Sequence, residues 1–257
     1  MSALMLHCDA GPPAIVHRRG GSPLLLLCDH AGRAVPAALG DLGVPPAAFE
    51  RHIAWDIGAE ALALALAERW DATLIAQRYS RLVIDCNRDP ARVDAMPESS
   101  DGQPIPANAG LSPEARAARV AAIHTAYHAA IEAEVEARLA AGQATQVLAV
   151  HSFTPRMAGV DRPWRYGVLH LGGSAFSDAA IVALRREAGD DVVGDNEPYR
   201  MDAIDYTIPR HAIARGLDYL ELEVRQDLIA DADGVAAVAA LLDRALASAA
   251  AQARREA

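Results

Sequence analysis

Two or three histidines (His30, His151 and His52) and several carboxylates, among them Asp56, could contribute to a catalytic metal site. His30 and His151 each follow a short apolar run, and Asp56 lies just before a segment with helical periodicity. Two imidazoles and one carboxylate, with a fourth position open, are a ligand set of catalytic zinc. Each residue also has a structural interpretation, since a histidine can bond within a tight turn and an aspartate before a helix can cap it.

Further residues suited to catalysis and substrate binding lie in residues 80–88. This segment reads Ser-Arg-Leu-Val-Ile-Asp-Cys-Asn-Arg and places Arg81 before an apolar run and Asp85, Asn87 and Arg88 after it. Arginine is the side chain best shaped to hold a carboxylate through two hydrogen bonds. The alternative is a cluster of ion pairs on the surface.

A second group of charged residues alternates with apolar ones. Glu221, Glu223 and Arg225 are separated by Leu and Val, so they point to one face of a predicted strand. A carboxylate on that face can act as a general base toward water at a metal. A solvated edge strand would give the same pattern.

Composition excludes several other chemistries. All 24 basic residues are Arg, so the chain has no Schiff-base, P-loop or Ser–Lys lysine and is not a pyridoxal phosphate enzyme. The motifs G-x-S-x-G, G-x-G-x-x-G and H-E-x-x-H are absent. With a net charge of −10 and no basic run, we expect no nucleic-acid partner.

The chain reads as a cytoplasmic protein without a membrane partner. Its three cysteines are far apart and form no C-x-x-C pair, which argues against a disulfide scaffold or a thiolate zinc site. His7 and Asp9 interrupt the apolar start, so no signal peptide is expected. We expect no apolar run that approaches the roughly 18 residues of a membrane span. The oligomeric state is left open.

Short apolar runs alternate with longer helical stretches and must position these residues. The predicted strands cover residues 24–28, 73–76, 82–86, 146–151, 167–171 and 219–224, and the predicted helices cover residues 57–70, 113–141, 177–188 and 234–253. Ser112 can cap the long middle helix and Gly142 can end it. The sequence therefore predicts a single α/β domain over residues 1–257, with three α/β/α layers and a mostly parallel, mixed central sheet. Residues 89–113 are expected to form one long surface loop, as functional lids often do.

Several sequence blocks together resemble the N-formylglutamate amidohydrolase family over about residues 22–230. They are His30-Ala-Gly-Arg33, His52-Ile-Ala-Trp-Asp-Ile-Gly-Ala59, Tyr79-Ser-Arg-Leu-Val-Ile-Asp-Cys-Asn-Arg-Asp-Pro90, His151-Ser152, Asp195-Asn-Glu-Pro-Tyr199 and Glu223-Val-Arg-Gln-Asp-Leu228. The resemblance implies a fold of the phosphorylase/hydrolase-like kind, related to zinc carboxypeptidases. Those enzymes take a His and, three residues on, a Glu as metal ligands. Here position 33 is Arg, so Asp56 is the nearest candidate for the carboxylate.

The resemblance also implies roles for individual residues. One Zn²⁺ per chain would be held by His30, Asp56 and His151, although His52 could replace one of them. Glu223 would be the general base and Arg81 would stabilise the developing oxyanion. Residues that would contact the substrate are Asn87, Arg88, Tyr206, His211 and Arg225.

The implied activity is zinc-dependent hydrolysis of a linear amide in a small acidic N-acyl amino acid. N-formyl-L-glutamate, cleaved to L-glutamate and formate, is the expected substrate. Hydrolysis of a different N-acyl amino acid or small peptide on the same scaffold is one alternative. A non-catalytic binding protein is the other, because a fold alone does not establish an activity.

Overall fold

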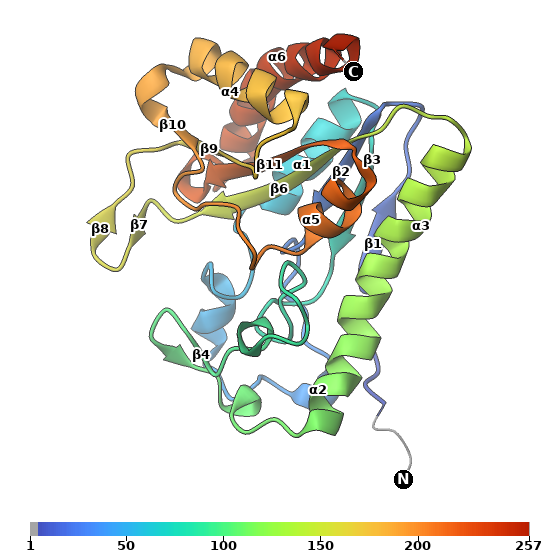
Figure 1. Cartoon of the computed structure of the whole chain (residues 1–257). Coiled ribbons are helices and arrows are strands. Elements are labelled where there is room, and N and C mark those ends of the chain that lie inside the picture. Colours follow the sequence, from blue (N-terminus) through green and yellow to red (C-terminus); the bar gives the residue numbers. More distant parts are fainter. Residues whose placement is uncertain (1–4, 257) are drawn as a thin grey trace.

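A seven-stranded mixed sheet forms the centre of the computed structural model, which describes residues 5–256 (Figure 1). The strand order is β1-β3-β2-β6-β11-β9-β10. The strands are β1 (Ala14–His17), β2 (Leu24–Cys28), β3 (Thr73–Gln77), β6 (Gln146–Phe153), β9 (Tyr166–Leu169), β10 (Val193–Asp195) and β11 (Asp218–Arg225). Two small hairpins lie outside this sheet, β4 (Ser99–Ser100) with β5 (Gln103–Pro104) and β7 (Arg156–Met157) with β8 (Val160–Asp161).

Most of the central strands run in one direction. β2 pairs in parallel with β3 and β6, and β6 pairs in parallel with β11. β1 is antiparallel to β3, and β9 is antiparallel to β11. The predicted mixed α/β fold is therefore confirmed. Because β2, β6 and β11 are parallel, their carboxyl ends meet at one edge, where open α/β sheets bind ligands.

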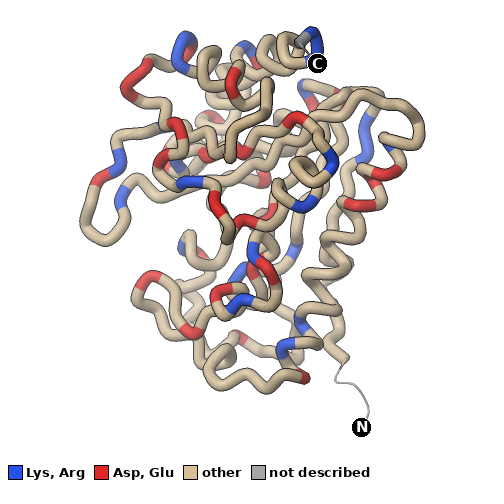
Figure 2. The backbone as a smooth tube through the Cα atoms, viewed as in Figure 1, with Lys and Arg blue, Asp and Glu red and all other residues tan. Residues whose placement is uncertain are grey.

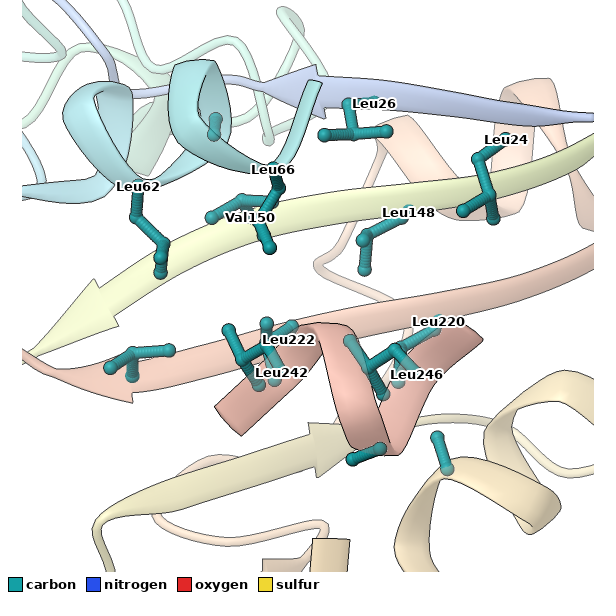
Figure 3. Packing of buried hydrophobic residues seen from close by; sticks show 14 of the residues in the cluster. Leu24, Leu26, Leu62, Leu66, Leu148, Val150, Leu220, Leu222, Leu242 and Leu246 are labelled. Atoms are coloured by element: carbon teal, nitrogen blue, oxygen red, sulfur yellow. The ribbon is translucent and has the colours of Figure 1, made fainter. Parts of the chain in front are cut away.

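Helices cover both faces of the sheet. One face packs against α1 (Ala59–Arg69), α4 (Ala175–Ala188) and α6 (Ala232–Glu256), and the other lies under α3 (Ala126–Ala140) and α5 (Thr207–His211). Leu24 and Leu26 belong to the first buried cluster, whereas Leu25 and Leu27 belong to the second. A strand buried on both faces has apolar residues throughout, which explains the continuous run in β2. Figure 3 shows leucines of α1 and α6 against those of β2, β6 and β11.

The C-terminal helix α6 differs from one expectation. Over Ala232–Arg255 it contains an 18-residue window with a mean hydropathy of 1.5, enough in length and composition to cross a membrane. The expectation that no apolar run approaches that length was therefore wrong, because the many alanines of α6 raise its hydropathy. Leu242 and Leu246 of this helix are fully buried against the sheet (Figure 3). The same pattern is typical of a core helix.

The long middle helix has the predicted ends but an irregular centre. The Ser112 side chain accepts a hydrogen bond from the Ala115 amide at its start, and Gly142 follows its end with a φ of 64°. Between α2 (Pro113–Arg119) and α3, Val120–Thr125 forms a π-helical segment. Such segments shift the register of the side chains that follow and are frequent near functional sites.

The predicted strand at residues 82–86 is absent. The Ser80 hydroxyl accepts from the Leu82 amide and donates to the Ala54 carbonyl, and the Val83 amide bonds the Ser80 carbonyl. These bonds turn the backbone before it can join the sheet. Residues 82–84 are apolar because they are buried in the core, where they belong to the cluster on the α3 face. The short strands β1 and β10 were not predicted.

Two histidines of the middle helix hold the segment that follows this turn. His128 Nε2 lies 2.9 Å from the Cys86 carbonyl oxygen, and His128 Nδ1 lies 2.9 Å from His211 Nε2. A carbonyl only accepts, so His128 carries its proton on Nε2 and accepts the His211 Nε2–H at Nδ1. His124 Nε2 lies 3.0 Å from the Arg88 carbonyl. Residues 86–88 are therefore held in place by neutral imidazoles.

We expect Leu148→Ala to lower the free energy of unfolding by about 2–5 kcal/mol, because Leu148 is fully buried in β6 between two other strands. Leu139→Ala is the matched control, since Leu139 on α3 is 45% exposed. It should cost roughly 0.5 kcal/mol or less. Urea unfolding of the two variants measures both values, and equal losses would contradict this packing.

The buried histidine pair predicts a loss of stability in mild acid. Burial and the neighbouring His124 lower the pKa of His128 to about 3, and burial and the Arg210 charge lower the pKa of His211 to about 4. Free histidine titrates near pH 6.5, at about the unfolded-state value. The unfolded chain therefore binds more protons below pH 6.5, and this contribution to stability falls as the pH drops toward 4.

The measurement is the urea midpoint at pH 7.5 and pH 5.0 for the wild type and for His211→Gln. The substituted glutamine keeps a donor but does not titrate, so the variant should lose less stability between the two pH values than the wild type. Identical losses would show that the pair is not neutral in the folded state.

Candidate active site

A cavity of about 530 Å³ opens at the carboxyl ends of β6 and β11. The segment after β2, the turn before α1 and residues 81–88 complete its inner wall. Part of the predicted long loop also borders it, through Asp94, Pro97, Ser99, Ser100 and Asp101. Acidic residues and arginines are both present in the loops that lie below the sheet in the view of Figure 2.

His30, Asp56 and His151 lie together in the buried wall of this cavity. Their candidate ligand atoms all lie within 4.8 Å of one another. Asp56 Oδ2 is 3.0 Å from His151 Nδ1 and 3.4 Å from His30 Nδ1, and it accepts a hydrogen bond from the Ser152 amide. The Asp56 amide in turn donates to the His30 carbonyl. Backbone and side chain together therefore fix Asp56 between the two strand ends.

Asp56 does not cap α1. The residue at the N-cap position is Gly58, and within residues 5–256 no side-chain hydrogen bond caps that helix. Gly58 has a φ of 80°, and an added Cβ would come within 2.3 Å of the Ile229 carbonyl oxygen. The capping interpretation is therefore wrong, and the Asp56 carboxylate is free to face the cavity.

A second carboxylate lies behind each imidazole. His30 Nε2 is 2.8 Å from Asp85 Oδ1, and His151 Nε2 is 3.3 Å from Asp29 Oδ2. Asp29 is itself held, because its other oxygen accepts from the Thr207 hydroxyl. In metal sites a carboxylate at the far nitrogen fixes the tautomer and orientation of a histidine ligand. The residues present therefore fit a metal ion, with a donor set of two nitrogens and one oxygen typical of catalytic zinc.

The charges of this group stabilise one another. Burial alone would raise the pKa of Asp56, but the adjacent His30 and His151 hold it well below its usual range. Burial likewise disfavours the Asp85 anion, yet Arg81 and His30 lower its pKa. The same carboxylates raise the pKa of His30, against the effect of burial and Arg81. A divalent cation would replace the protons of the two imidazoles.

Arg81 bridges two of these carboxylates. Its Nη2 and Nε lie 2.5 Å and 3.1 Å from Asp85 Oδ2, and its Nη1 lies 3.3 Å from Asp56 Oδ1. The guanidinium lines the cavity and its side chain is 27% exposed. The alternative of a surface cluster of ion pairs is thus wrong, because the network is buried. Arg81 can reach an oxygen in the cavity.

Glu221 and Glu223 project from β11 into the same cavity. β11 is a central strand between β6 and β9, so the solvated-edge alternative is wrong. Glu223 pairs in register with His151 on one side and with Gly167 on the other. Burial raises the pKa of both glutamates, and one oxygen of each has no hydrogen-bond partner among the described residues. A carboxylate in this state is suited to accept a proton.

Asn87 and Arg88 also line the cavity, but parts of both are already engaged. Asn87 Oδ1 accepts from the amides of Tyr206 and Thr207 and so holds the start of α5. Arg88 Nη1 donates to the Asn87 carbonyl and lies 3.5 Å from Asp205 Oδ1. The Arg88 side chain is 20% exposed.

Four other candidates lie outside this grouping. His52 lines the cavity, but it lies 3.7 Å from Asp101 and outside the group that could hold a metal. Tyr206, His211 and Arg225 do not line the cavity. The Tyr206 ring packs beside His124 and His128, and Arg225 forms an ion pair with Asp227.

Sequence reasoning assigned no specific role to Asp29, Asp85 or Arg200, although it placed Asp85 with Asn87 and Arg88 as a candidate. Asp29 and Asp85 orient the imidazoles, and Asp29 directly precedes one of them, which was an available signal. Arg200 lines the cavity from the segment after β10. No periodicity in that segment pointed to it.

Comparisons with known proteins show which family this chain resembles. The sequence profile of the N-formylglutamate amidohydrolase family matches residues 22–230. A crystal structure of a gene product from Agrobacterium tumefaciens is 35% identical, with a TM-score of 0.91 over 96% of this chain and 98% of the other. No curated protein matches the sequence.

A crystal structure of N-formylglutamate amidohydrolase from Ralstonia eutropha is 21% identical, with a TM-score of 0.67 over 95% of this chain and 99% of the other. At that identity the likeness supports the fold. The profile match covers most of the chain, including every residue of the His30, Asp56, His151 and Glu223 grouping. The chain therefore belongs to the N-formylglutamate amidohydrolase family, a family of amide-hydrolysing enzymes.

Proposed function

We propose that this protein is a zinc-dependent amidohydrolase that cleaves N-formyl-L-glutamate to L-glutamate and formate. The observation that carries the proposal is the placement of Glu223 in register with His151, in the cavity that also contains His30 and Asp56. We propose the same single hydrolytic domain over residues 1–257, and its cytoplasmic location stays a prediction.

His30, Asp56 and His151 would hold the zinc. Asp85 and Asp29 would accept the Nε2–H of the two imidazoles, which leaves each Nδ1 free as a ligand. When bound, zinc supplies a Lewis acid that polarises the amide carbonyl and lowers the pKa of a water. The ligand atoms and their orienting partners all come from this chain.

Glu223 would remove a proton from the attacking water and pass it to the leaving nitrogen. Water adds to the formyl carbon, the C–N bond breaks, and formate and the free amine leave. The buried carboxylate accepts a proton readily because burial raises its pKa. Arg81 would donate to the oxygen that gains negative charge, and Arg88 with the Asn87 amide would hold a substrate carboxylate.

One observation favours a second class of candidate substrate. The cavity lining contains more carboxylates than arginines, which opposes a doubly negative ligand. Another N-acyl amino acid or a small peptide would be hydrolysed by the same residues. Formate release from N-formyl-L-glutamate, measured beside a library of N-acyl amino acids, decides between the two.

Glu223→Gln should lower kcat for formate release by about 10²–10⁴-fold, because the amide cannot take up the proton. Zinc content should not change, since Glu223 is outside the ligand group. The control is Glu136→Gln, at an exposed position of α3 away from the cavity. Full activity in Glu223→Gln would remove this residue from the mechanism.

The purified protein should contain about one zinc per chain, as a catalytic site of this type holds. A chelator should abolish formate release, and added zinc should restore it and raise the Tm of the apoprotein. Asp56→Ala should lose both the zinc and the rise in Tm. His170→Gln is the control, because His170 pairs with Asp195 outside the cavity.

Elemental analysis and thermal unfolding measure these effects without any assumption about the substrate. Bound zinc without formate release would support a metal-dependent hydrolase that acts on a different amide. No bound metal, even after reconstitution with zinc, would contradict the mechanism and favour a binding protein.

A further inference from the structure

The charges around the cavity determine which residues can receive an acidic substrate. Among the described residues, its lining includes eight carboxylates, which are Asp56, Asp85, Asp94, Asp101, Asp202, Asp205, Glu221 and Glu223. It includes three guanidiniums, which are Arg81, Arg88 and Arg200. A substrate with carboxylates must therefore find an arginine whose donors are not already taken.

Two of the three arginines are paired within the protein. Arg81 donates to both Asp56 and Asp85. Arg88 donates to the Asn87 carbonyl and lies 3.5 Å from Asp205 Oδ1. Only some of its guanidinium donors are therefore available for a ligand. A substrate with a single carboxylate can be held there.

Arg200 differs from both. Its side chain is exposed and lines the cavity. Within residues 5–256, no carboxylate lies within ion-pair distance of it and no side-chain hydrogen bond engages it. All five of its donors are available for a ligand at the open side of the cavity.

The residues on both sides of Arg200 make contacts that hold the segment in place. Asn196 Oδ1 accepts from the Met201 amide at 3.3 Å and from the His170 amide at 3.0 Å. Met201 is 1% exposed, and the Tyr199 hydroxyl accepts from Arg162. A guanidinium on a fixed segment loses less freedom on binding than one on a mobile loop, which favours a recognition role.

We infer that Arg200 receives the side-chain carboxylate of a dicarboxylic N-acyl amino acid, while Arg88 holds its α-carboxylate. This inference rests on the proposed function and assigns the substrate preference of that site to one residue. Arg200 thereby offsets the acidic lining for substrates with a second negative charge. It contributes to substrate affinity and takes no part in bond cleavage.

The test compares N-formyl-L-glutamate with N-formyl-L-glutamine, which has nearly the same shape without the second charge. In Arg200→Gln, KM for the glutamate substrate should rise about tenfold, as expected for loss of one exposed charge-assisted contact. KM for the glutamine substrate and kcat for both should stay unchanged. Arg200→Lys should keep part of the preference, and raised salt should weaken it in the wild type.

The matched control is Arg186→Gln, whose side chain is 66% exposed on α4, outside the cavity. It should leave all four kinetic constants unchanged. Equal rises in KM for both substrates in Arg200→Gln would overturn the inference, and so would no rise for either.

A binding measurement separates this inference from the proposed function. Thermal shifts of the zinc-loaded wild type and Arg200→Gln are recorded with glutarate and with its monoamide. The wild type should be stabilised more by glutarate, and the variant should show no such difference. If no formyl amide is hydrolysed but this difference is present, the proposed function fails while the dicarboxylate site stands. No preference for glutarate in the wild type would overturn the site.

Discussion

The arrangement of this site depends on the contacts that the Asp56 carboxylate makes with His30 and His151. This carboxylate lies within 3.4 Å of one nitrogen of His30 and within 3.0 Å of one nitrogen of His151, and it takes a third bond from the Ser152 amide. Buried charges of this kind are stable only when each has partners, because desolvation costs several kcal/mol per ion. Asp29, Asp85 and Arg81 pair with the remaining charges of this group. Removal of any one member therefore leaves a buried charge without its partner.

The sheet makes this network possible. Parallel β2 and β6 bring His30 and His151 to one edge, and β11 adds Glu223 beside His151. On the other side of Glu223, β9 must carry glycine, since a Cβ at Gly167 would lie 2.3 Å from the Glu197 carbonyl oxygen. Glu223 is buried beside this closely packed backbone, and burial raises its pKa.

The proposed substrate selection depends on the balance of charge beyond this network. Zinc and the arginines together would offset an acidic lining that otherwise repels a carboxylate. Arg81 is committed to the network and Arg88 is partly committed, whereas Arg200 belongs to a fixed segment and has no internal partner among residues 5–256. In the proposed mechanism, the buried residues of the cavity therefore carry out the hydrolysis, and the exposed Arg200 side chain sets the preference for a substrate with a second carboxylate.

The sequence by itself determined the elements and the residue types of the site. Apolar runs predicted β2, β3, β6, β9 and β11, and polar residues at their ends predicted where ligands bind. It could not distinguish a buried turn from a strand at residues 82–86, because burial makes both apolar. Only the tertiary structure decided that Asp56 faces two imidazoles instead of capping α1, that Tyr206 and His211 support the site from outside the cavity, and that Arg200 lines it. These outcomes depend on contacts between residues far apart in the chain, and local periodicity contains no information about such contacts.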